Sequence, residues 1–197
     1  MNPDKCSNLH KSYALISELS KLKVVFRNTK TQMDRKESTA EHSWSASMIV
    51  MILRDELKQE FTQIDELKII KLVLIHDIVE IYAGDVMVFD REARKNKAAE
   101  EIAALEQLKN LYPDFGHQLN DLWYEFEAKE TLEAKIAKAA DAICPIFQRL
   151  HVKQSYISIN ISLDQLNQTK QPLFEFSQTF LTLYENLKND LLNEQLI

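Results

Sequence analysis

Glycine, proline and cysteine are all scarce in this chain of 197 residues, which contains two, four and two of them respectively. Because most tight turns use glycine or proline, their scarcity leaves few positions for β-hairpins and predicts a nearly all-helical protein. The two cysteines, Cys6 and Cys144, are too few for a disulfide framework. The sequence therefore predicts an all-α fold in a reducing compartment, the cytoplasm.

A surplus of positive charge and a long apolar run are also missing. The formal net charge is −6 at pH 7, whereas a surface for general nucleic-acid binding would be basic. No run reaches the roughly 18 apolar residues of a membrane span, and residues 1–9 lack the apolar core of a signal peptide. We therefore expect neither a nucleic-acid polymer nor a membrane as a partner, although local cations could still bind a small anion.

The hydrophobic residues, 45% of the chain, suffice for one sizeable core and predict a single domain over residues 1–197. Their spacing predicts helices over about residues 5–22, 39–58, 65–82, 90–111, 115–129, 131–153 and 172–195. Residues 38–41 are a candidate capping box, and Gly84 is a candidate helix stop. Between the first two helices, residues 23–36 carry five cations and should form a loop, either solvated or part of an anion site.

Two of these helices carry apolar stripes that should face the core. The stripe of the first helix is Leu9, Tyr13, Ile16, Leu19 and Leu22, and that of the last is Phe176, Phe180, Leu183, Tyr184, Leu187 and Leu191.

A histidine and an acid, His76 and Asp77, interrupt an otherwise apolar run from residue 72 to residue 79. Burying an unpaired charge costs about 3–5 kcal/mol when its partner is lost, so something must compensate these side chains. A divalent metal is one such partner. Helical spacing puts Glu80 on the same face one turn further on, and Asp85 follows directly after the turn at Gly84.

His42 and Asp141 could complete a metal site with this dipeptide. His42 lies in the first turn of the second expected helix, and alanines that would let helices approach closely flank Asp141. Two imidazoles and two carboxylates suit Mn²⁺, Fe²⁺, Co²⁺, Ni²⁺ or Mg²⁺, with positions left for water or substrate. Such an ion polarises a phosphoryl oxygen, and Glu80 could then act as general acid or base. The alternative is that these residues lie apart, since a lone His-Asp pair is common.

The stretches that hold these residues resemble the HD-domain metal-dependent phosphohydrolases. More narrowly, they resemble the branch of the bacterial 5'-deoxynucleotidases and their uncharacterised relatives. The matching stretches are residues 37–44, 75–85, 122–128 and 137–141, within a resemblance over about residues 9–145. The resemblance implies an all-α helical bundle that is usually a homodimer. The metal-site core would cover about residues 37–145, with the last helix packed on it.

The resemblance also assigns roles to single residues. It implies that the metal ligands are His42, His76, Asp77 and Asp141. Glu80 matches the catalytic acid or base, Asp85 matches an acid that recognises the deoxyribose, and Arg27 matches an arginine that faces the substrate phosphate. This assignment puts Arg27 and Asp85 at opposite ends of the substrate. One position departs from the family pattern, because Asn28 stands where the deoxynucleotidases have a tryptophan of the nucleotide pocket.

The leading hypothesis is an enzyme that uses one divalent ion (Mn, Co, Fe, Ni or Mg) to remove phosphate from 2'-deoxynucleoside 5'-monophosphates. One alternative is a related hydrolase for another phosphorylated metabolite or nucleotide, such as a nucleoside triphosphate or an alarmone. Another is a catalytically silent nucleotide-binding protein, against which the presence of all four ligands and Glu80 argues.

Overall fold

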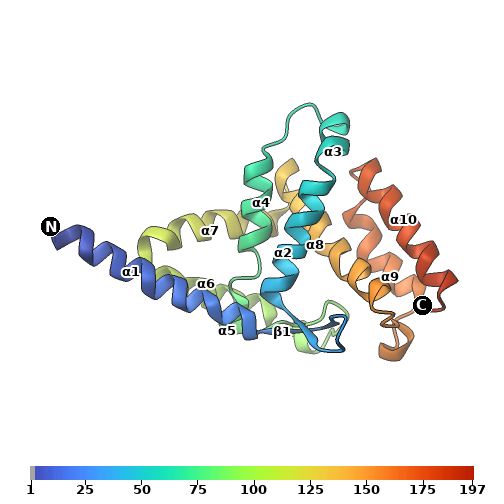
Figure 1. Ribbon diagram of the computed structural model, residues 1–197, viewed down its shortest axis with the longest axis horizontal. Helices are drawn as coiled ribbons and strands as arrows, with labels where there is room; N and C mark the ends of the chain where they lie inside the picture. The colour runs from blue at the N-terminus through green and yellow to red at the C-terminus, as the bar shows by residue number, and fades with distance from the viewer. Residues whose placement is uncertain (1–2) are drawn as a thin grey trace.

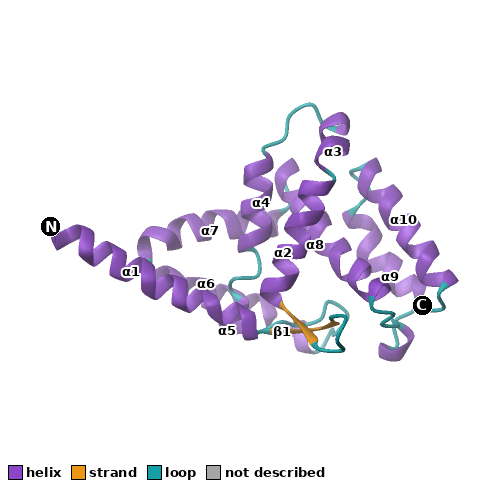
Figure 2. Cartoon of the chain, viewed as in Figure 1, coloured by secondary structure: helices purple, strands orange, loops and turns teal. Residues whose placement is uncertain are grey.

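The computed structural model describes residues 3–197, with only the backbone for residues 3–8 and 114. Figures 1 and 2 show that helices make up most of this part of the chain, which confirms the all-α prediction. The helices are α1 (Pro3–Leu19), α2 (Thr39–Ile52), α3 (Arg54–Glu60), α4 (Glu66–Ile75), α5 (Glu80–Ala83), α6 (Lys97–Leu111), α7 (Pro113–Ala128), α8 (Leu132–His151), α9 (Leu163–Lys170) and α10 (Gln178–Asn193). None of the described helices is long and apolar enough to cross a membrane.

Helix α8 lies at the centre of the molecule, and α2, α4, α7 and α10 pack against it (Figure 1). Apolar side chains form two clusters. The larger one joins α2, α4, α8 and the C-terminal helices and includes Val73 and Ile143. The smaller one lies where α6 and α7 meet the end of α4 and includes Ile75, Leu105 and Trp123. The two clusters meet at the turn that follows α4.

The basic segment between α1 and α2 forms a hairpin, so the prediction of a plain loop was wrong. Strand β1 (Phe26–Lys30) pairs antiparallel with β2 (Lys36–Ser38). The turn between them passes through Asp34, whose φ of 57° lies in the left-handed region that aspartate tolerates better than most residues. The missing glycine therefore did not prevent a hairpin here. The hairpin leads directly into α2 and brings β1 beside α8.

Two of the predicted helices are broken. The helix expected over residues 65–82 ends at Ile75 and resumes at Glu80, and the helix expected over 39–58 is divided at Leu53. The predicted cap and stop are both confirmed. The Ser38 hydroxyl accepts a hydrogen bond from the backbone N–H of Glu41 (3.3 Å), whose carboxylate accepts one from the N–H of Ser38 (2.8 Å). Gly84 ends α5 with a φ of 75°, which favours glycine.

The apolar stripe of α1 is not buried, which contradicts the prediction. Leu9, Tyr13 and Ile16 are 72%, 69% and 68% exposed, and only Leu22 at its end is buried. The N-terminal half of α1 extends beyond the rest of the molecule (Figure 1). The stripe of α10 is buried as predicted at Phe180, Tyr184, Leu187 and Leu191, while Phe176 and Leu183 are partly buried against the core.

Candidate metal centre

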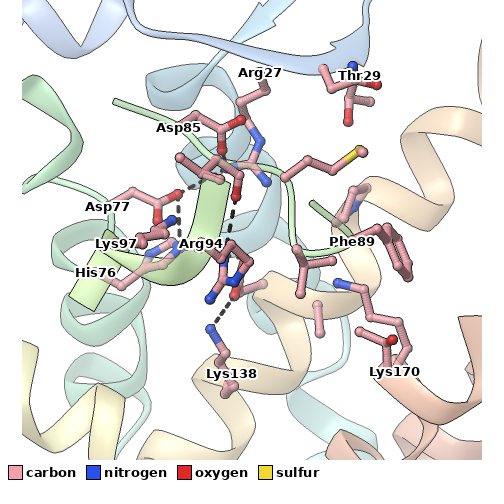
Figure 3. Close-up of a pocket in the computed structure, with 18 of the residues that line it drawn as sticks. Arg27, Thr29, His76, Asp77, Asp85, Phe89, Arg94, Lys97, Lys138 and Lys170 are labelled. Carbon is pink, nitrogen blue, oxygen red and sulfur yellow. Dashed lines mark hydrogen bonds and ion pairs between the residues drawn. The ribbon is translucent and has the colours of Figure 1, made fainter. Parts of the chain in front are cut away.

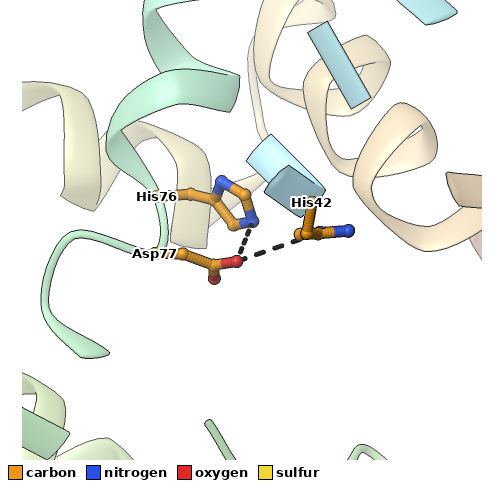
Figure 4. Close-up of side chains that lie close together, drawn as sticks. All are labelled: His42, His76 and Asp77. Atoms are coloured by element: carbon orange, nitrogen blue, oxygen red, sulfur yellow. Dashed lines mark ion pairs between the residues drawn. The ribbon is translucent and has the colours of Figure 1, made fainter. Parts of the chain in front are cut away.

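The four predicted ligands meet at one point, although they come from three separate elements. His42 lies in the first turn of α2, His76 and Asp77 form the turn after α4, and Asp141 lies in the middle of α8. The Nε2 atom of His42 is 3.0 Å from Asp141 Oδ1 and 3.8 Å from Asp77 Oδ2. The Nε2 atom of His76 is 3.0 Å from Asp77 Oδ2 and 3.5 Å from Asp141 Oδ1. Figure 4 shows the two histidines and Asp77 converging.

Local sequence explains why these side chains can converge. The capping box at Ser38 fixes the start of α2, so that His42 enters the bundle interior, where its side chain is fully buried. On α8, buried alanines surround Asp141 and let α2 and α4 approach closely. The helix break after Ile75 turns the His76-Asp77 pair towards the same point.

The four atoms fit a divalent metal. Metal–ligand bonds of about 2.1 Å in octahedral geometry put neighbouring ligand atoms about 3 Å apart, close to the separations found here. His42, His76 and Asp77 present ligand atoms that all lie within 4.8 Å of one another. Asp141 adds a fourth oxygen in contact with both rings.

The protonation of His76 supports the same conclusion. Its Nδ1 atom is 2.6 Å from the carbonyl oxygen of Val73, which can only accept, so Nδ1 carries the hydrogen. The Nε2 atom faces the carboxylates of Asp77 and Asp141 and is the nitrogen free to bind either a proton or a metal. In the described part of the chain this buried atom has no hydrogen-bond partner. A bound cation would satisfy it, and an imidazole anchored through its other nitrogen is typical of metal ligands.

The charges around the histidines attract a cation. Burial lowers the pKa of His76, but the Asp77 and Asp141 carboxylates outweigh burial and raise that pKa to about 10. Burial and the nearby charge of Arg27 instead lower the pKa of His42 to about 4. Two carboxylates thus hold positive charge at this point, either as a proton on His76 or as a metal ion in its place.

Glu80 begins α5 beside this cluster and is 1% exposed. Its carboxyl group accepts a hydrogen bond from the Thr39 hydroxyl at 3.0 Å and pairs with Lys97 Nζ at 3.4 Å. Burial raises the pKa of Glu80 to about 8, and the charges of Asp77 and Asp85 contribute. A carboxyl group that titrates near neutral pH can both hold and release a proton, which suits a general acid or base.

Arg27 and Asp85 are in direct contact, whereas we expected them at opposite ends of a substrate. Arg27 points from β1 into the site, where its Nη1 atom lies 3.2 Å from Asp85 Oδ1 and 3.3 Å from Asp77 Oδ2 (Figure 3). The turn at Gly84 brings Asp85 back towards the cluster. A buried guanidinium needs a counter-charge, and without a phosphate these two carboxylates supply it.

Sequence reasoning missed three polar residues of the site. Lys138 donates to Asp141 Oδ2 at 2.9 Å, and its position three residues earlier on the same helix could have revealed it. Lys97 starts α6 and reaches Glu80 across 17 positions of sequence, for which no local signal exists. Glu37, on β2, is buried with its Oε2 atom 3.8 Å from Arg27 Nε.

The site opens into a cavity of about 230 Å³. Besides the carboxylate cluster, the lining of the cavity includes Asn28 and Tyr156, and also Phe89 and Lys170, which Figure 3 labels. The Asn28 side chain, which stands at the position of the family tryptophan, accepts a hydrogen bond from Arg149 Nη2 at 2.8 Å. The cavity is therefore built differently at this position from what the resemblance implies.

Comparisons with known proteins agree with this geometry. Residues 19–179 match the HD domain family. The 5'-deoxynucleotidase HDDC2 of Xenopus laevis is 32% identical over 124 residues, which cover 62% of this chain and 59% of that protein. The human protein of the same name is 29% identical over 125 residues, or 63% of this chain and 56% of that protein. The matched region thus spans less than two thirds of the length of these curated relatives.

A solved structure matches along the full length. The protein is described as a predicted metal-dependent phosphohydrolase from Magnetospirillum magnetotacticum MS-1. Its TM-score is 0.88 at 26% identity, with 100% of this chain and 99% of that chain covered. The family match extends over most of the sequence and includes both histidines and both acids of the cluster. The chain therefore belongs to the HD domain family.

Proposed function

We propose that this chain is a metal-dependent phosphohydrolase that removes phosphate from 2'-deoxynucleoside 5'-monophosphates, with the whole chain acting as one HD domain. The convergence of two histidines, two aspartates and Glu80 at one cavity is the observation that carries the proposal. The names of the Xenopus and human relatives, both 5'-deoxynucleotidases, support the substrate class.

In this proposal, His42, His76, Asp77 and Asp141 hold one divalent ion, for which Mn²⁺, Co²⁺, Fe²⁺, Ni²⁺ and Mg²⁺ are all suitable. When bound, such an ion polarises a phosphoryl oxygen and lowers the pKa of water. Glu80 moves the proton that the reaction requires at the leaving oxygen, and Thr39 and Lys97 orient its carboxyl group.

Arg27 and Asp85 act on the substrate beside the cluster. The phosphate dianion replaces the carboxylates as the partner of Arg27, whose planar guanidinium suits bidentate contact with phosphate oxygens. Asp85, once released from Arg27, accepts a hydrogen bond from the sugar next to that phosphate. The oxygens of Asp85 that accept this hydrogen bond are then no longer available to a ribose 2'-hydroxyl. A ribonucleotide would leave that hydroxyl without a partner, which favours the deoxy sugar.

A related hydrolase for another phosphorylated metabolite is the second candidate. The observation that favours it is the fixed position of Asn28, which is held by Arg149 where the family tryptophan would shape a nucleotide pocket. The two candidates share the metal ligands, Glu80 and Arg27, and differ only in the group attached to the phosphate.

Phosphate release from a substrate panel tests both candidates. The metal-loaded protein is assayed with paired deoxy and ribo 5'-monophosphates, nucleoside triphosphates and sugar phosphates, beside Glu80→Gln and the exposed control Asp190→Asn. Preferential release from the deoxy member of each pair supports the first candidate. Equal rates on both sugars reject a deoxynucleotidase and leave the broader hydrolase. A protein that binds metal and nucleotide yet releases no phosphate would be a silent binding protein.

We further propose that the protein works as a homodimer in the cytoplasm. Leu9, Tyr13 and Ile16 form an exposed apolar stripe on α1, and the same stripe of a second copy could cover it. Light scattering of the unmutated protein should give twice the mass of one chain. The double variant Leu9→Glu and Ile16→Glu should give the mass of one chain. A monomer in both cases would reject the dimer. The compartment rests on the low cysteine content, and cell fractionation tests it.

A further inference from the structure

Lys170, the last residue of α9, is a largely buried cation that has no partner among the described side chains. Its side chain is 8% exposed and lines the cavity of the metal centre. Figure 3 shows its amino group pointing into that cavity, on the side that faces the carboxylate cluster. With the side chains of residues 9–113 and 115–197 it forms neither an ion pair nor a hydrogen bond, although an ammonium group has three hydrogens to donate.

Most acids that line the cavity pair with other cations, and among the described side chains none forms an ion pair with Lys170. Asp77 and Asp85 pair with Arg27, and Glu80 and Glu101 pair with Lys97. Asp141 pairs with Lys138 and contacts both histidines, and Glu127 is exposed. The amino group of Lys170 reaches the cavity, so an anionic group that entered the cavity would meet a charged donor with no competing ion pair.

A second cation without an acidic partner lines the same cavity. Arg149 is 3% exposed, donates to Asn28 Oδ1 and to the carbonyl oxygen of Ser155, and lies over the Tyr156 ring at 4.8 Å. None of these partners is an acid. Burial lowers the pKa of Lys170 to about 8, against the attraction of Asp141, so the amine is still mostly charged at neutral pH. Neither Lys170 nor Arg149 forms an ion pair with an acid among the described side chains.

We propose that Lys170 binds a second anionic group of the substrate, a phosphate or a carboxylate separate from the phosphate that is removed. The proposal rests on the proposed function, because it takes the first phosphate to lie at the metal cluster. Phe89 and Tyr156, with ring centroids 6.4 Å apart, also line the cavity and offer an aromatic surface against which a nucleobase could pack. The substrate class is then a 5'-nucleotide with a further anionic group.

Binding of matched ligand pairs tests the proposal. The first pair is 2'-deoxyadenosine 3',5'-bisphosphate and 2'-deoxyadenosine 5'-monophosphate, which probes a sugar phosphate. The second is 5-carboxy-2'-deoxyuridine 5'-monophosphate and 2'-deoxyuridine 5'-monophosphate, which probes a base carboxylate. Dissociation constants are measured by calorimetry on the metal-loaded Glu80→Gln protein, so that the ligands are not hydrolysed.

We expect one of the two ligands with a second anionic group to bind roughly 10- to 100-fold more tightly than its parent, the scale of charge-assisted hydrogen bonds. Adding Lys170→Met should reduce this ratio to about one. The control is Lys129→Met, which removes the same charge from an exposed residue of the same cavity and should keep the ratio. If Lys170→Met does not fold, Lys170→Gln serves instead.

Two results would overturn the proposal. One is that, with Lys170 in place, both ligands with the second anion bind no more tightly than their parents. The other is that Lys170→Met leaves the ratio of the two dissociation constants unchanged. The outcome is separable from that of the proposed function. Normal phosphate release from monophosphates together with an unchanged ratio rejects only the second anion site. If the protein releases phosphate from no ligand but its ratio of dissociation constants depends on Lys170, only the proposed hydrolysis is rejected.

Discussion

Replacing Asp77 with alanine should abolish metal binding and activity together. Asp77 supplies a carboxylate oxygen 3.0 Å from His76 Nε2 and 3.8 Å from His42 Nε2, in the middle of the proposed ligand set. It also pairs with Arg27, so its removal destabilises the metal-free protein as well. The informative quantity is therefore the rise in melting temperature that metal produces in each variant, and not the melting temperature itself.

The expected rise follows from mass action. A metal at about 100 times its dissociation constant stabilises the folded state by about 2.7 kcal/mol. For a chain of this size, each kcal/mol moves the melting temperature by about 2–4 °C, which gives a rise of about 5–11 °C. Losing a residue that only supports a metal ligand weakens metal binding by up to about 100-fold. If losing Asp77 has an effect of this size, the metal-dependent rise in melting temperature falls to about 1–2 °C.

Differential scanning calorimetry with and without metal, together with elemental analysis, measures this effect. Asp190→Ala removes an exposed aspartate of α10 and should keep the full rise. An Asp77→Ala protein that retains one equivalent of metal and the full rise would refute the ligand assignment.

Three further predictions concern other residues. Glu80→Gln should lower kcat roughly 10²- to 10⁴-fold while the metal-dependent rise in melting temperature persists, and normal turnover would move the proton transfer to another group. Arg27→Ala should weaken all phosphate substrates alike, whereas Asp85→Ala should mainly change the ratio of deoxy to ribo rates; steady-state kinetics on paired monophosphates separates the two. Ser38→Ala should reduce the free energy of unfolding by about 0.5–2 kcal/mol through loss of the α2 cap. Ser162→Ala, which removes the same motif from α9, should cost a similar amount in urea titrations, and no loss in Ser38→Ala would contradict the capping role.

The features that the sequence predicted well are those with local causes. The capping box at Ser38 and the stop at Gly84 depend on residues within four positions, and both were found. The ligands were identifiable because a histidine and an acid inside an apolar run conflict with burial unless something compensates them. The resemblance then linked His76 and Asp77 to His42 and Asp141, which lie 34 and 64 positions away and which the structure brings within 4 Å of them.

The features that the sequence did not predict depend on packing between distant elements. Periodicity identified an apolar face on α1 but could not tell whether this chain covers it, and Tyr13 is exposed. The apolar spacing of residues 65–82 predicts one continuous helix, but the helix is broken between α4 and α5. At this break His76 and Asp77 contact side chains of α2 and α8, which local spacing does not reveal. The contact of Lys97 with Glu80 exists only because α6 folds back over α5.

The end of α4 joins the two apolar clusters, since Val73 belongs to the larger and Ile75 to the smaller, and the turn that holds His76 and Asp77 follows directly. A metal held both by this turn and by His42 and Asp141 would act as a cross-link between them. Local opening of α6 and α7 would then require the metal to leave or the larger cluster to open as well. With the metal removed, backbone amides of α6 and α7 should exchange hydrogen faster than those of α8. The ion would thus determine whether the bundle unfolds as one cooperative unit or as two.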